Sequence, residues 1–112
     1  MKKDPEIFLK HILESIEYIN EYMGLKSEQD FLESVETQDA VMRRLAVIGE
    51  AAKDIPVHLR ERHTGIEWKA IIGLKNVLVH EYFGVDIGVI WHIVKDDLPN
   101  LKSEISEMLK EV

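Results

Sequence analysis

Apolar residues recur every three or four positions along most of the chain, which is the spacing of one face of an α-helix. The first such stripe lies within residues 5–23. Asp4 and Pro5 precede it and Gly24 follows it, and these residue types are typical of a helix start and a helix end. No stretch shows the two-residue alternation of a strand. The pattern therefore predicts an all-α protein. The members of the first stripe are Phe8, Ile12, Ser15 or Ile16, Ile19 and Met23.

Two more helices are expected in the next part of the chain. Ser27 and Asp30 have the spacing of a capping box, which would open a short helix that contains Phe31. Thr37 is expected to cap a longer helix over residues 38–54. That helix is apolar on more than one side, so we expect it to lie at the centre of the fold.

The second half of the chain predicts three further helical segments. Residues 57–63 follow Pro56, which ends the preceding helix, and have room for one or two helical turns. Residues 67–81 form the next apolar stripe. Asp86 is expected to cap the last helix, in which Pro99 either produces a kink or opens a continuation.

The chain has 112 residues, of which 46% are hydrophobic, and it contains no cysteine. This length suits one domain, so residues 1–112 are expected to form a single antiparallel bundle of four or five helices. The lack of cysteine excludes zinc fingers, iron–sulfur centres, thiol nucleophiles and disulfide scaffolds. No apolar run approaches the roughly 18 residues of a membrane span. We therefore expect a soluble, cytoplasmic protein.

The net charge of −7 argues against a general nucleic-acid-binding protein, but the charge is unevenly distributed. Residues 41–80 hold 7 basic and 4 acidic side chains, whereas residues 1–40 hold 4 basic and 10 acidic ones. The same middle third contains His58, His63 and His80. An anionic ligand is therefore expected to bind in this part of the molecule.

Lys75 is the first candidate for chemistry, because on an ideal helical wheel it lies within the apolar arc of Trp68, Ile72 and Val79. Its amine either extends to water past the edge of the bundle, or faces a pocket or partner surface that uses a fixed positive charge. His80 lies five positions later, about 140° away. It is either a surface group near a helix end or a catalytic residue whose site a second subunit completes.

Residues 73–86, GLKNVLVHEYFGVD, resemble the signature of the HEPN superfamily, and most closely its HepT-like branch. The motif of that branch is arginine, four residues, histidine, one residue and tyrosine. Similar segments also occur at residues 44–52, 66–68, 91 and 97–99. The resemblance covers nearly the whole chain.

The resemblance implies an all-α homodimer with a ribonuclease site at the subunit interface and without a metal or other cofactor. Proteins of this branch are typically toxins of type VII toxin–antitoxin systems, neutralised by a minimal nucleotidyltransferase antitoxin, in some cases through adenylylation (AMPylation) of the motif tyrosine. By position, His80 matches the catalytic histidine, Tyr82 the modified tyrosine and Asn76 the polar residue after the arginine. Lys75 replaces the arginine and loses its two-pronged contact with phosphate.

Other interpretations stay open at this point. The chain could be a non-catalytic binding subunit or substrate of the nucleotidyltransferase, with nuclease activity weakened by Lys75, or a helical dimer with an unrelated role. Glu50 either lies on a solvated polar face or acts as a carboxylate that orients His80 or pairs with Lys75. Gly49 would allow the close helix approach that such a pair needs.

Two tryptophans and two histidines are not expected to take part in the chemistry. Trp68 and Trp91 are expected to pack in the core or in an interface and not to stack on bases. His11 and His92 lie outside any cluster in the sequence and are assigned no role.

Overall fold

The computed structural model describes residues 4–80 and 84–112, and all regular structure within those ranges is helical. This confirms the predicted all-α class. The elements in chain order are α1 (Pro5–Met23), α2 (Glu28–Glu33), α3 (Val35–Lys53), α4 (Val57–Glu61), α5 (Trp68–His80), α6 (Ile87–His92), the π-helix η2 (Ile93–Asp97) and α7 (Leu98–Leu109).

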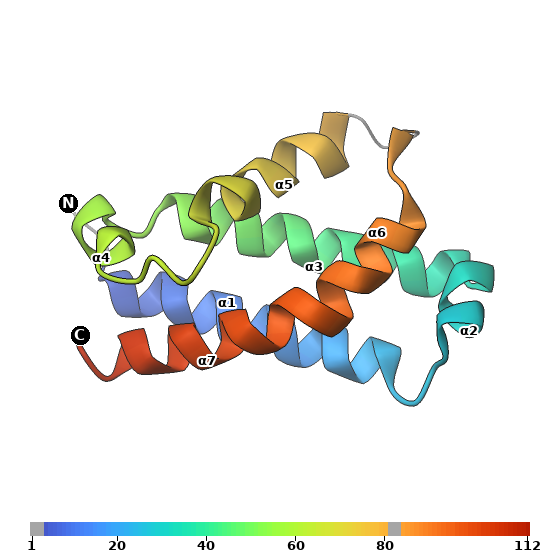
Figure 1. The fold of residues 1–112 in the computed structure, drawn as a ribbon, viewed down its shortest axis with the longest axis horizontal. Coiled ribbons are helices and arrows are strands. Elements are labelled where there is room, and N and C mark those ends of the chain that lie inside the picture. Colours follow the sequence, from blue (N-terminus) through green and yellow to red (C-terminus); the bar gives the residue numbers. More distant parts are fainter. Residues whose placement is uncertain (1–3, 81–83) are drawn as a thin grey trace.

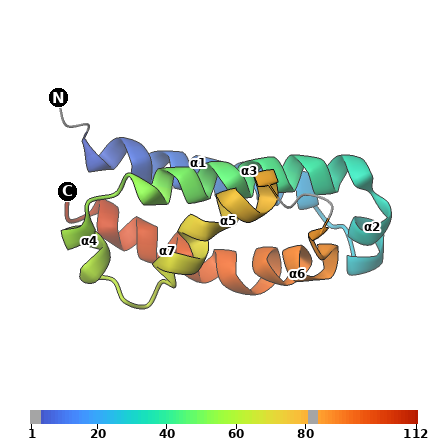
Figure 2. The same ribbon diagram turned by 90° about the horizontal axis from the view of Figure 1, so that it is seen from above.

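The long helices run alternately in opposite directions, and both ends of the chain lie at the same end of the bundle (Figure 1). Helix α3 packs against α1 on one side and α5 on the other, while α7 packs against α1. Figure 2 shows the same arrangement from above, with α2 and α4 at opposite ends. The predicted helical bundle is therefore confirmed, with α3 at its centre. Its largest fully buried side chains include Leu9, Ile12, Ile16, Ile19, Phe31, Leu45, Ile48, Ile55, Ile105 and Met108.

The predicted helix ends at the start of the chain are confirmed. Asp4 caps α1, because its Oδ1 accepts a hydrogen bond from the Glu6 amide at 2.9 Å. Gly24 ends this helix with a φ of 50°, a conformation that costs glycine less than any other residue. Ser27 and Asp30 form the reciprocal capping box, with both hydrogen bonds at 3.1 Å.

The prediction that Thr37 caps the central helix is wrong, because Ser34 is the cap. The Ser34 Oγ accepts from the Thr37 amide at 3.2 Å, and its hydroxyl donates to the Thr37 Oγ1 at 2.9 Å. Thr37 itself lies buried in the first turn. Either of two hydroxyl residues three positions apart can cap a helix. Because Ser34 is the cap here, Val35 is the first helical residue.

Helices α6, η2 and α7 form one continuous helical rod with a wider turn in the middle. Asp86 caps it as predicted, since its Oδ1 accepts from the Gly88 amide at 2.8 Å. In the wide turn, the Leu98 amide bonds to the Ile93 carbonyl, five residues back. Pro99 follows directly and has no amide hydrogen to donate. Pro99 therefore opens the continuation, as one of the two alternatives expected.

Both tryptophans pack against the core, as predicted. The indole N–H of Trp68 donates to the His63 carbonyl at 3.0 Å, which ties the start of α5 to the preceding loop. The ring of Trp91 lies 5.8 Å from that of Phe31, between α6 and α2.

Helix α5 is the least covered of the long helices. Leu78 is its one buried residue, while the side chains of Val77 and Val79 are 41% and 55% exposed. The helix also rises away from the rest of the bundle toward its carboxyl end (Figure 1). No helix in the described ranges has the length and apolar character needed to cross a bilayer.

Candidate active site

The site begins with an unusually close approach of α3 and α5 at Gly49. A Cβ atom built on this glycine would lie 2.8 Å from the Ile71 carbonyl oxygen and 3.2 Å from the Lys75 backbone nitrogen. Real side chains do not tolerate the shorter of these distances. The missing side chain at Gly49 therefore lets the backbone of α5 reach α3 next to Lys75, as the sequence suggested.

The residue after this glycine, Glu50, pairs with Lys75. The Lys75 Nζ lies 2.8 Å from the Glu50 Oε2, and that oxygen is shielded from solvent although both side chains are partly exposed. The contact is an ion pair between a carboxylate on α3 and an ammonium group on α5. Of the arrangements left open for Glu50, the structure contains the pairing with Lys75.

The charge environment of Glu50 favours its ionised form. The Lys75 ammonium is the main cause that lowers the pKa of the Glu50 carboxyl, and Lys53 adds a smaller effect in the same direction. Partial burial opposes both. Glu50 therefore carries its negative charge at neutral pH, and its contact holds Lys75 at the wall of a pocket.

This pocket, the Lys75 pocket, has a volume of about 270 Å³ and lies between α1, α3 and α5. Most of its polar residues come from the middle third of the chain, where the sequence placed the excess of basic groups. The apolar part of its wall includes Phe8, Val47 and Val79. The polar lining residues are His11, Arg43, Glu50, Asp54 and Lys75.

Three polar residues of this pocket were not predicted, namely His11, Arg43 and Asp54. His11 was assigned no role, and Arg43 and Asp54 were not among the candidate residues, yet all three line the pocket with Lys75. Helix packing brings them there, since α1 and α5 both lie against α3. A sequence signal existed for His11, which lies three positions after Phe8 and four before Ser15, at the edge of the apolar stripe of α1.

The other motif residues lie outside the Lys75 pocket. His80 and Asn76 are exposed on α5, and neither lines the pocket. Because α5 stays helical through His80, residues 75 and 80 point about 140° apart. The structure thus brings Lys75 and Glu50 together but leaves His80 on another face of α5. Tyr82, the predicted modification site, lies outside the described residues.

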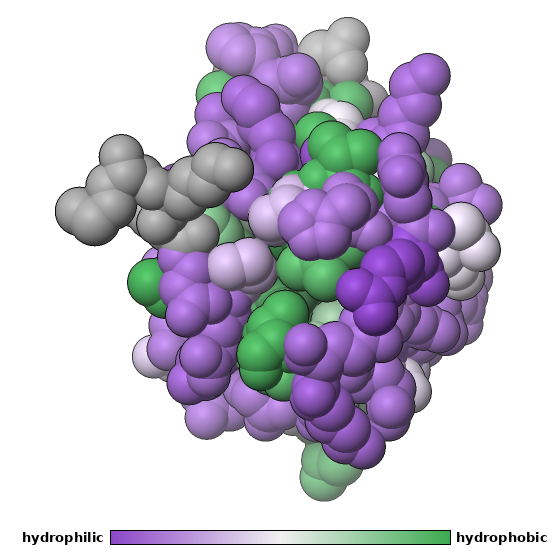
Figure 3. Space-filling model, turned by 90° about the vertical axis from the view of Figure 1, so that its left-hand side faces the viewer, coloured by the Kyte–Doolittle hydropathy of each residue, from purple (hydrophilic) through white to green (hydrophobic). Residues whose placement is uncertain are grey.

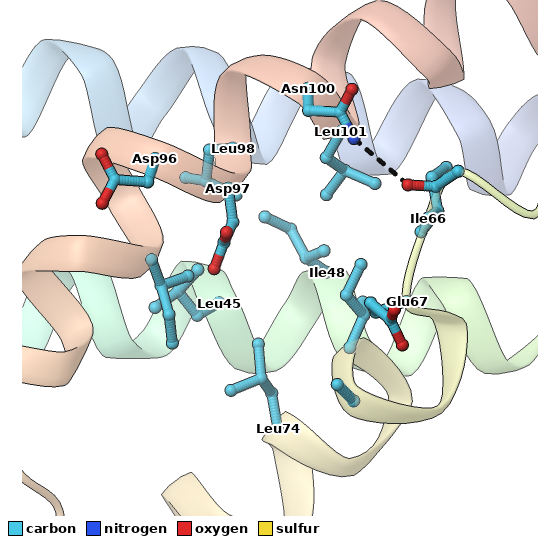
Figure 4. A pocket seen from close by; sticks show the side chains of 14 residues that line it. Leu45, Ile48, Ile66, Glu67, Leu74, Asp96, Asp97, Leu98, Asn100 and Leu101 are labelled. Carbon is cyan, nitrogen blue, oxygen red and sulfur yellow. Dashed lines mark hydrogen bonds between the residues drawn. The ribbon is translucent and has the colours of Figure 1, made fainter.

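A larger cavity of about 450 Å³ lies between α3, α5 and the η2–α7 segment. Figure 4 shows aliphatic side chains of these elements around it, with Asn100 donating to the Gly65 carbonyl at 3.3 Å. Its ionisable lining residues are Glu67, Asp96 and Asp97. Three carboxylates and no lysine or arginine make this cavity unsuitable for a phosphate group.

His63 forms a separate ionic cluster at the end of the bundle that carries α4. Its Nε2 lies 3.0 Å from Glu111 Oε2 and its Nδ1 lies 3.4 Å from Glu104 Oε2, while its side chain is only 11% exposed. The contact with Glu111, followed by that with Glu104, raises the pKa of His63. The surface at this end is mostly hydrophilic (Figure 3). The cluster ties the loop after α4 to α7.

Comparison with known proteins shows the family to which the chain belongs. The model of the HepT-like ribonuclease family matches residues 12–108. A Methanocaldococcus jannaschii protein, named as a gamma-glutamylcyclotransferase and candidate RNase, is 48% identical over 112 residues, which are 100% of this chain and 50% of that protein. The chain thus spans half the length of this relative.

Two relatives of similar size match along nearly their whole length. A probable ribonuclease HepT of Thermococcus cleftensis is 40% identical over 98% of this chain and 100% of its own. A candidate RNase of Caldanaerobacter subterraneus subsp. tengcongensis is 37% identical over 97% of each chain. No solved structure shows a significant match. Together, the family match and these relatives establish that the chain belongs to the HepT-like ribonuclease family.

Proposed function

We propose that this protein is a metal-independent endoribonuclease toxin that acts as a homodimer and is restrained by a minimal nucleotidyltransferase antitoxin. The observation that carries the proposal is the position of Lys75. This residue occupies the place of the motif arginine, and Glu50 holds its ammonium at 2.8 Å on the wall of a pocket. Family membership supports the ribonuclease activity, and the toxin role is carried over from the motif resemblance.

The chemistry requires one group that moves protons near neutral pH and one cation. The ribose 2′-hydroxyl attacks the adjacent phosphorus, a 2′,3′-cyclic phosphate forms and the bond to the 5′-oxygen breaks. His80 transfers a proton to or from the reacting ribose oxygens. Lys75 stabilises the negative charge that develops on the phosphoryl oxygens. Asn76, exposed beside Lys75, serves as a supporting hydrogen-bond donor to the RNA.

A second copy of the chain resolves the geometric separation of Lys75 and His80. Within one protomer the two side chains point about 140° apart, so His80 of a partner subunit is the one that reaches the Lys75 pocket. Most of α5 is at least partly exposed, which favours the assembly of two chains along this helix. Val77 exposes apolar surface on the motif helix and does not line the Lys75 pocket, and a two-fold contact along α5 would bury it.

Glu50 positions Lys75 before RNA binds, and an RNA phosphate displaces it when the substrate enters the site. As a counterion it holds Lys75 toward the pocket, and its exposed side chain can swing away when an RNA phosphate replaces it. We assign Glu50 the role of a positioning residue and not of a base, because its ionised form is the one that Lys75 stabilises.

The proposed antitoxin acts at Tyr82, the motif tyrosine. Transfer of an adenylyl group to its hydroxyl would add a negatively charged phosphodiester and a bulky nucleoside two residues from His80. The added charge would repel RNA phosphates and offset the charge of Lys75. This modification would therefore inactivate the nuclease without unfolding it.

A second candidate function is a binding subunit or substrate of the nucleotidyltransferase without its own nuclease activity. The observation that favours it is the same ion pair, because Glu50 neutralises a lysine that already lacks the planar fork of arginine. RNA cleavage measured in excess chelator separates the two functions. Cleavage to 2′,3′-cyclic phosphate ends supports the enzyme, and an inert protein that binds the nucleotidyltransferase supports the binding subunit.

A further inference from the structure

We propose that His11 is a second proton-transfer residue of the ribonuclease site, acting on the substrate from helix α1 across the Lys75 pocket. The inference rests on the proposed function and adds a catalytic residue that lies outside the motif helix. Of the five histidines of the chain, all within the described residues, His11 is the one that lines the pocket with Lys75.

The location of His11 suits contact with a substrate. The residue is exposed on α1, one turn after Phe8, and both belong to the pocket wall opposite the residues that α5 contributes. On the α5 side, Lys75 and Val79 are also one turn apart. The pocket thus combines an imidazole from α1 with a cation from α5, and its other polar lining residues come from α3 and the residue that caps it.

Cleavage of RNA by transesterification needs both a base and an acid. One imidazole removes the proton from the 2′-hydroxyl as the new oxygen–phosphorus bond forms. A second, protonated imidazole gives its proton to the 5′-oxygen as the old phosphorus–oxygen bond breaks, so the enzyme is proton-neutral over the step. His11 and the partner subunit's His80 are one such pair on a single phosphate.

The charges around His11 are mixed. Helix α3 presents Arg43, Glu50 and Asp54 to the same pocket, and α5 presents Lys75. Glu50 is already engaged by Lys75. The combination of cations and an exposed imidazole in a volume of about 270 Å³ fits an RNA phosphodiester better than a neutral ligand.

The test is the pH profile of RNA cleavage by His11→Gln, with His92→Gln as the matched control. His92, on α6, is also an exposed helical histidine, but its Nδ1 pairs with Asp96 on η2. We expect His11→Gln to cleave about 100-fold more slowly and to lose one limb of the bell-shaped profile, while His92→Gln resembles the parent. Thermal midpoints should not change, since His11 is exposed.

Two results would overturn the role of His11. If His11→Gln cleaves RNA at the parental rate, His11 has no catalytic role. If the variant is slower but its pH profile keeps both limbs, His11 contributes to packing or binding only. If His80→Ala loses activity while His11→Gln does not, the proposed function stands and only this inference fails. A parent that does not cleave RNA contradicts both.

Discussion

Gly49 and Ile71 lie where the two helices that build the site approach closely, since a Cβ on Gly49 would lie 2.8 Å from the Ile71 carbonyl oxygen. The contact determines how far Lys75 lies from α3, and hence whether Glu50 can reach its ammonium. Glycine at this buried position is therefore a requirement of the site as well as of the packing.

Gly49→Ala should destabilise the protein by about 1–3 kcal/mol, because α3 and α5 must move apart to accept the methyl group. Gly73→Ala on α5 is the control, since a Cβ there meets nothing within 4 Å. Alanine at that helical position should stabilise the fold by about 0.5–1 kcal/mol. Denaturant unfolding measures both. Equal effects of the two substitutions would contradict the close approach.

Substitution of Lys75 tests how the site uses its positive charge. Lys75→Arg should raise the rate of RNA cleavage, because a guanidinium binds phosphate through two parallel hydrogen bonds. Lys75→Met should abolish most cleavage with little loss of thermal stability, since the side chain is 41% exposed. Cleavage rates and thermal midpoints of the three proteins provide the comparison.

The outcome of this series separates the candidate functions. A parent that is inert but gains cleavage with arginine would indicate a weakened nuclease. Three equally inert proteins that still bind a nucleotidyltransferase would indicate the binding subunit. Lys75→Met with parental cleavage would show that the lysine merely extends to water, against the role proposed here.

The His63 cluster predicts a pH-dependent contribution to stability. The contact with Glu111 raises the pKa of His63 above 6.5, so this contribution is complete below pH 6.5 and is lost as the pH rises through the folded-state pKa. The pKa of Glu111 is lowered from 4.5 by the same contact, so its share is lost as the pH falls below 4.5. The cluster therefore stabilises most between these two values.

Thermal midpoints of the parent, His63→Gln and His58→Gln measure this contribution. His58 is exposed on α4 and is the control. Between about pH 6 and pH 8.5, the parent and His58→Gln should lose stability relative to His63→Gln, which lacks the titrating group. Parallel curves for all three proteins would argue against a charged His63 in the folded state.

The proposed dimer predicts a specific effect of charge on α5. Light scattering at micromolar concentration should give twice the chain mass for the parent and the single mass for Val77→Glu, whose side chain would place a charge in the interface. Val57→Glu on α4, at a valine that is 56% exposed, should remain dimeric. A monomeric parent would contradict a site that combines Lys75 of one subunit with His80 of the other.

Most of the fold could be predicted because its signals are local. The cap at Asp4, the positive φ at Gly24 and the capping box at Ser27 each depend on neighbours within four residues. The error at Thr37 arose because Ser34 offers an equivalent hydroxyl one turn earlier, and residue type and spacing alone do not decide between the two. The π-turn before Pro99 could not be distinguished from a kink by spacing alone.

The site was only partly predictable, because its residues come from three helices. The motif identified Lys75, and the possible pairing with Glu50 followed from the glycine beside it. His11 and Arg43 were missed in that role, since the packing of α1, α3 and α5 brings them to the pocket and the position of His11 beside an apolar stripe was the one hint in the sequence. The separation of Lys75 and His80 was predictable from helix geometry, and the fold retains it.

The most direct test of the composite site is the RNA cleavage rate, in chelator, of a purified heterodimer between a His80→Ala subunit and a Lys75→Met subunit carrying different tags. Each homodimeric variant should be inactive. The heterodimer keeps Lys75 on one subunit and His80 on the other, so one of its two sites is intact and about half of the parental rate is expected. A heterodimer as inactive as either homodimer would contradict a site shared between subunits.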